Sequence, residues 1–111
     1  MFGSFFTKRI PIQEKEPDQQ MQRLVELLTE IDQSSLPDRE YDYVLRGDDH
    51  VNISEIQSLA CDLFIGEGSP KFDEIDLLHK QYGYFIFPGE RDRFGWVTAC
   101  LQTKKGIIVF G

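Results

Sequence analysis

The chain has 111 residues, of which 41% are hydrophobic and 28% are charged, and its formal net charge is -7. This length and composition fit one globular domain with a single core, and they exclude a transmembrane, a collagenous or a wholly disordered chain. An acidic protein repels nucleic acid and anionic lipid and attracts basic protein surfaces. We therefore expect neither nucleic acid nor a membrane as a partner.

The N-terminal part of the chain predicts a connector followed by a helix. Residues 1–17 are expected to form a partly flexible connector, because residues 11–19 are polar and contain two prolines. The single domain is expected to span residues 18–111. A helix is predicted from about Asp18 to Gln33, since apolar residues recur there at the spacing of one helical face. These residues are Met21, Leu24, Leu28 and Ile31.

A β-hairpin is predicted across residues 41–53. The segment from Tyr41 to Leu45 resembles a short strand, and Val51 and Ile53 alternate with polar residues as on a half-buried strand. Gly47 lies between the two segments, where a turn needs backbone freedom.

Two further helices are expected in the middle of the chain. Ser54 and Gln57 match a capping box at the start of the first, whose apolar face consists of Ile56, Leu59, Ala60, Leu63 and Phe64. Ser69 and Pro70 provide the cap and first position of the second, and Gly83 ends it. Its predicted buried stripe consists of Phe72, Ile75, Leu78 and Tyr82.

The C-terminal part predicts a three-stranded antiparallel meander with strands at 84–87, 96–103 and 107–110. Residues 104–106 form the expected three-residue hairpin loop, which would place Thr103 opposite Ile107 and Leu101 opposite Val109. Both faces are then apolar, so either helices cover both or one face meets a partner. The fold class is therefore α+β, in the order helix, β-hairpin, two helices and three-stranded antiparallel meander.

The residues that usually carry chemistry are sparse. Cys61 and Cys100 have neither metal-site nor disulfide-framework spacing, which favours free thiols in a reducing, cytoplasmic compartment. His50 and His79 have no second ligand at metal-binding spacing. We therefore predict no cofactor, no metal and no catalytic residue, and we expect that the protein is not an enzyme.

Charge is the main functional signal in the sequence. Residues 41–76 carry nine acidic side chains against Arg46 and Lys71. We therefore expect a small acidic protein-binding module, such as an immunity or inhibitor protein that neutralises a basic partner such as a nuclease toxin. The predicted contact residues are the acids Asp48, Asp49, Glu55 and Asp62, with Tyr41 and Tyr43 as anchors.

A second candidate region lies before the long C-terminal strand. Glu90, Arg91 and Arg93 alternate in charge and precede Trp96, and Arg and Trp are the residue types that dominate binding hot spots. This segment is either part of a site or a structural turn. It supports an alternative function, a small-ligand-binding or enzymatic domain with a site near Trp96 and the 90–93 loop. A third interpretation is a structural homodimer formed through the C-terminal strands.

Overall fold

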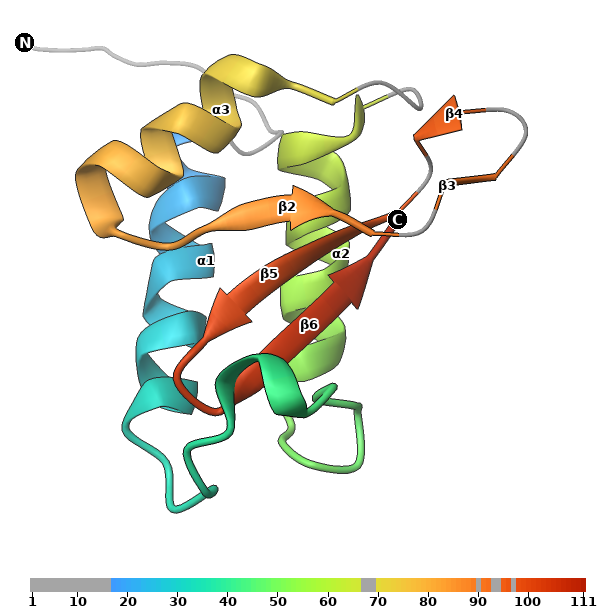
Figure 1. Cartoon of the computed structure of the whole chain (residues 1–111). Coiled ribbons are helices and arrows are strands. Elements are labelled where there is room, and N and C mark those ends of the chain that lie inside the picture. The colour runs from blue at the N-terminus through green and yellow to red at the C-terminus, as the bar shows by residue number, and fades with distance from the viewer. Residues whose placement is uncertain (1–16, 67–69, 90, 93–94, 97) are drawn as a thin grey trace, which may run out of the picture.

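The computed structural model describes residues 17–66, 70–89, 91–92, 95–96 and 98–111. These described residues contain three helices and a three-stranded antiparallel sheet, which confirms the predicted α+β class. Helices α1 (Pro17–Asp32) and α2 (Ile53–Phe64) lie against one face of the sheet (Figure 1). Apart from Pro17, the predicted connector lies outside the described residues.

The core lies between these two helices and the sheet. The α1 residues predicted from their spacing are all buried, and Leu27 joins them. The apolar face of α2 is buried as predicted, including Leu63 and Phe64. The rings of Phe64 and Phe110 pack with their centroids 6.2 Å apart, which joins α2 to the last strand. Within the described residues, no helix is both long and apolar enough to cross a bilayer.

The sheet has the strand order β2 (Ile86–Pro88), β5 (Ala99–Thr103) and β6 (Gly106–Phe110). Thr103 pairs with Gly106 rather than with Ile107, so the hairpin register differs by one residue from the prediction. The loop contains only residues 104 and 105, and the Thr103 hydroxyl closes it by donating to Gly106 O at 2.7 Å. One sheet face is therefore buried core, with Ala99, Leu101, Ile108 and Phe110.

The hairpin predicted at residues 41–53 is wrong. A short 3-10 helix, η1 (Glu40–Asp42), takes the place of its first strand, and Val44 makes one parallel bridge to Ile107 of β6. Ile53 is the first residue of α2 and is fully buried, whereas Val51 is 90% exposed. The alternation of these two residues therefore reflects a turn that enters a helix. The predicted capping box is wrong as well, because the cap position is residue 52 and lacks a side-chain capping bond.

The third predicted helix is present, but its α-helical part is shorter than predicted and its last turn is π-helical. Helix α3 (Phe72–Leu77) continues into a π-helical turn, η3 (Leu78–Tyr82). The predicted cap, Ser69, lies outside the described residues, and Pro70 precedes the helix. Gly83 ends the turn in the left-handed conformation, with φ of 82°, as predicted. Phe72 is 68% exposed, so its assignment to the buried stripe is wrong.

Candidate functional site

The outer face of the sheet, opposite helices α1 and α2, carries exposed aromatic side chains. Ile86 pairs with Leu101 on the core side, so Phe85 and Phe87 alternate onto the outer side. η1 lies over this side (Figure 1), where the ring centroids of Tyr41 and Phe87 are 5.6 Å apart. Tyr41 is 62% exposed and Phe85 is 52% exposed. We refer to Tyr41, Phe85 and Phe87 as the aromatic face.

An open pocket of about 410 Å³ lies beside the aromatic face. The end of α1, η1, the segment that follows η3, and the turn between β5 and β6 contribute to it. Four aromatic residues line this pocket together with one acidic, one amide and one basic residue. The residues that line it are Asp32, Tyr41, Tyr82, Gly83, Tyr84, Phe85, Gln102, Thr103 and Lys104. We call it the tyrosine pocket.

Asp32 organises the tyrosine pocket. Its Oδ2 accepts a hydrogen bond from the Tyr84 hydroxyl at 2.8 Å, and its Oδ1 accepts one from the backbone N–H of Lys104 at 3.1 Å. Burial, followed by the hydrogen bond to Asp32 and its negative charge, raises the pKa of Tyr84 to about 12. The carboxylate therefore links the end of α1 to both the segment before β2 and the β5–β6 turn.

Gln102 of β5 lines the tyrosine pocket as well. Its Nε2 donates to the carbonyl of Thr103 at 2.6 Å. Its Oε1 is buried and receives no hydrogen bond from the described residues. Buried acceptors without a donor are rare in folded proteins, because the oxygen has lost its hydration without compensation.

Two of the predicted contact residues, Tyr43 and Asp49, are brought together by the fold. The Tyr43 hydroxyl donates to Asp49 Oδ1 at 2.9 Å, and the backbone N–H of Arg46 donates to Asp49 Oδ2 at 2.8 Å. These bonds, the Arg46 bond first, lower the pKa of Asp49, and the bond to Asp49 raises the pKa of Tyr43. The guanidinium of Arg39 lies 4.8 Å from the centre of the Tyr43 ring. Asp49 therefore closes the turn at residues 46–49.

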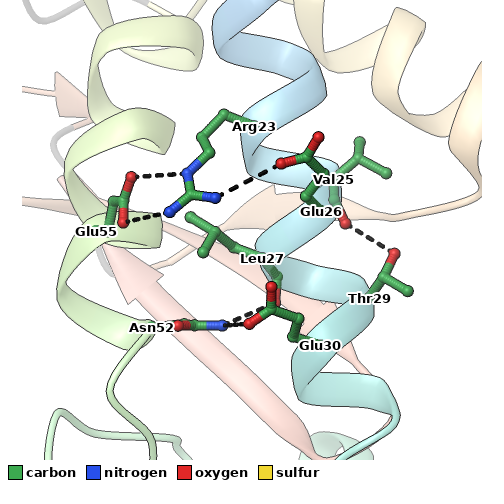
Figure 2. A network of polar contacts seen from close by, with 8 residues as sticks. All are labelled: Arg23, Val25, Glu26, Leu27, Thr29, Glu30, Asn52 and Glu55. Atoms are coloured by element: carbon green, nitrogen blue, oxygen red, sulfur yellow. Dashed lines mark hydrogen bonds and ion pairs between the residues drawn. The ribbon is translucent and has the colours of Figure 1, made fainter.

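Glu55 joins the two core helices. Figure 2 shows its carboxylate accepting two hydrogen bonds from the Arg23 guanidinium, at 3.0 Å and 3.2 Å. Below this pair, the side chain of Asn52 donates to Glu30 Oε1 at 2.9 Å (Figure 2). Glu55 thus takes part in packing α2 onto α1. The other two predicted acids, Asp48 and Asp62, are exposed.

The second candidate region forms a small ladder of its own. Strands β3 (Arg91–Asp92) and β4 (Gly95–Trp96) are antiparallel, with Arg91 opposite Trp96. The structure describes their backbone but not their side chains. Glu90 and Arg93 lie outside the described residues. The functional role predicted for these four residues therefore stays a prediction.

The histidines and cysteines occupy separate positions. His50 Nδ1 accepts the backbone N–H of Asn52 at 3.1 Å, and His79 stacks on Phe85 with ring centres 4.1 Å apart. Cys61 and Cys100 are unpaired. In the part of the chain that the structure describes, no three His, Cys, Asp or Glu residues are grouped to hold a metal ion.

Comparisons of this chain with protein-family models, with curated proteins and with solved structures find no match. The site must therefore be interpreted from its own chemistry. Of the residues that form this site, Tyr41 is among those predicted from the sequence, whereas Asp32, Tyr84, Phe85 and Gln102 are not. The sequence does carry one sign of this site, because four of the six residues at 82–87 are aromatic. A strand that is buried on one face needs apolar residues only at alternate positions, so the others are available for a surface site.

Proposed function

We propose that this protein is a binding module for a protein partner with a basic surface, and that the aromatic face is its contact surface. The observation that carries the proposal is the exposure of Tyr41 and Phe85, at 62% and 52%, beside the carboxylate of Asp32. Aromatic side chains at the centre of an interface contribute a large share of binding energy. An exposed cluster of them indicates a surface that a partner covers.

Charge supports a basic partner. The net charge of -7 attracts a positively charged surface over a distance and increases the association rate, most strongly at low salt. Asp48 and Asp62 add to this field without direct contact. The most specific form of the proposal is an immunity or inhibitor protein that neutralises a basic partner, such as a nuclease toxin, in the cytoplasm. The protein then acts by binding and not as an enzyme.

The homodimer through the C-terminal strands has less support. The outer edge of β6 is used within the chain, since Leu45 N donates to Ile107 O and Ile107 N donates to Tyr43 O, both at 2.8 Å. An edge that is already paired recruits a further strand less readily. Ile108 and Phe110 are committed to the core, so they offer little apolar surface to a second copy.

The test compares three forms of the full chain as bait in an extract of the source organism. The forms are the wild type, the double variant Tyr41→Ala/Phe85→Ala and the control Phe72→Ala. Phe72 is an aromatic residue that is 68% exposed on α3 and does not line the tyrosine pocket. We expect a net-positive protein that the wild type and the control retain and the double variant loses.

The captured protein is then purified and its binding is measured directly. Loss of two anchors should weaken the affinity by about 30-fold or more. Raising the salt from about 50 to 300 mM should lower the association rate of all three forms. A partner that binds the double variant as tightly as the control, or a partner with an acidic surface, would contradict the proposal.

A further inference from the structure

We propose that the tyrosine pocket is the receptor for an arginine side chain of the partner. This inference rests on the proposed function, and it adds the chemical group that the site recognises. The pocket combines aromatic walls, a carboxylate and a buried oxygen that lacks a donor, from segments far apart in the chain. Each of these features matches a different part of a guanidinium group.

The carboxylate of Asp32 is held in place by neutral donors. Its two hydrogen bonds come from the Tyr84 hydroxyl and from a backbone N–H, and neither donor carries charge. Asp32 forms no ion pair with the described residues. By contrast, Glu55 and Asp38 are each paired with a basic side chain. Asp32 is thus oriented by its bonds while its charge remains available to a cation.

The walls of the pocket favour a cation that is broad and weakly hydrated. Tyr41, Tyr82, Tyr84 and Phe85 contribute four aromatic rings. A cation lying over an aromatic ring is attracted by the negative face of the π system, and arginine makes this contact more often than lysine. A guanidinium also stacks flat on such rings, whereas an ammonium is compact and holds its water more strongly.

Gln102 supplies the second acceptor. Its Oε1 is buried without a donor among the described residues, and the side chain lines the same pocket as Asp32. A guanidinium carries five N–H donors in one plane and no acceptor. Because the Gln102 oxygen has no exposed surface, its amide must turn towards the pocket before a guanidinium can donate to it and to Asp32 at the same time. A neutral ligand could satisfy the amide oxygen but would not balance the charge of Asp32.

Lys104 is a basic residue of the pocket lining, so removing its charge should strengthen arginine binding. It is an exposed residue of that lining, and its positive charge therefore repels a bound guanidinium. Its contact with Asp32, however, is made by the backbone N–H. The change Lys104→Gln keeps that hydrogen bond and removes the charge. Arginine binding should then tighten by up to about 5-fold, the effect of one exposed charge about 4 Å away in water.

The experiment uses the full chain labelled with ¹⁵N and follows backbone amide shifts on titration with small probes. The probes are Nα-acetyl-arginine methylamide, its lysine counterpart, and the citrulline counterpart, which has the shape of arginine without the charge. We expect roughly millimolar binding of the arginine probe, with shifts at Gly83, Phe85 and Gln102. The citrulline and lysine probes should bind about fivefold more weakly or worse.

Two substitutions test the assignment of the charge. Asp32→Asn should abolish the preference for arginine over citrulline, while the control Asp62→Asn, which removes an exposed acid outside the pocket, should retain it. The amide spectrum of each variant shows directly that it is folded. Equal binding of arginine and citrulline, tighter binding of lysine, or a loss of affinity in Lys104→Gln would overturn the inference.

The outcome separates this inference from the proposed function. If the probes fail to discriminate but Tyr41→Ala/Phe85→Ala still releases the partner, the arginine receptor is wrong and the binding face stands. If the arginine probe binds with the expected preference but the double variant keeps its partner, the proposed contact surface is wrong. That second result would also overturn the assignment of the arginine to the partner.

Discussion

Gly106 holds the segment that follows η1 against the edge of the sheet, and its substitution should be costly. Its φ of 148° is a conformation that residues with a side chain rarely adopt. A Cβ at this position would lie 2.7 Å from the carbonyl oxygen of Tyr43 and 3.1 Å from Cγ of Leu45. Tyr43 would have to move away, although its carbonyl accepts the hydrogen bond from Ile107 N at 2.8 Å.

The expected cost of Gly106→Ala follows from these two effects. The unfavourable backbone conformation contributes about 1–2 kcal/mol, and the forced displacement of a packed segment contributes a similar amount. We therefore expect Gly106→Ala to lower the free energy of unfolding by about 2–4 kcal/mol. Gly47→Ala is the matched control, because a Cβ there would meet only Ser54 Oγ, at 3.8 Å. Its effect should stay within about 1 kcal/mol.

Urea denaturation measures the difference between these variants. Gly106→Ala should move the midpoint to lower urea with an unchanged slope, since the surface exposed on unfolding stays the same. The control should unfold close to the wild type. If the two glycine variants had equal stability, the close approach of Tyr43 to β6 would be refuted, and with it the position of η1 over the sheet.

Three other measurements test the core, the tyrosine pocket and the thiols. Leu63→Ala should destabilise by about 2–4 kcal/mol, because Leu63 is only 3% exposed; an unchanged urea midpoint would contradict the packing of α2. Tyr84→Phe should cost roughly 1 kcal/mol at pH 8, a value reduced for solvent screening because the phenol is only half-buried. The folded state raises the pKa of Tyr84 to about 12, so this stabilisation is complete below pH 10 and is lost towards pH 12. The difference in the free energy of unfolding between the wild type and Tyr84→Phe, measured by urea denaturation, should therefore narrow over that range. A constant difference would argue against the bond to Asp32. Maleimide should modify half-buried Cys61 faster than Cys100, which is 8% exposed and whose pKa is raised by burial. Intact-mass analysis after unfolding without reductant should show two added groups, and finding none would contradict the free thiols.

The sequence was sufficient to predict secondary structure where apolar residues repeat with one spacing over a long segment. Both core helices were predicted because their apolar residues repeat at helical spacing over several turns, and Gly83 was predicted as a helix end from its conformational freedom. The C-terminal hairpin was also predicted, but its register was not. Loops of two and three residues both fit the turn at Lys104, and the choice reverses which face of β6 is buried.

Short segments were predicted less well, because long-range contacts determined their structure. Tyr41 and Tyr43 alternate like strand residues, yet Tyr41 lies in η1 and packs on Phe87, whereas Tyr43 bonds to Asp49. The tyrosine pocket was not predicted at all. It depends on Asp32 meeting the turn at Lys104, a contact between residues 72 positions apart in the sequence. A local sequence pattern does not predict a contact between residues so far apart.

The acidic residues divide into two groups that serve different purposes, and this division explains how an acidic surface and an aromatic anchor can act together. Glu55 and Asp49 both hold elements of the fold, and the charge of Glu55 is partly balanced by its ion pair with Arg23. Exposed acids such as Asp62 have only a long-range effect on a partner, which does not require them to touch it. Their removal should therefore slow association. Removal of Phe85 should instead accelerate dissociation, because a side chain in direct contact stabilises the formed complex and hardly influences the encounter. Measured rate constants for Asp62→Asn and Phe85→Ala would thus assign the two effects to different parts of the molecule, and a change in the same rate constant for both would show that charge and aromatic contact belong to one surface.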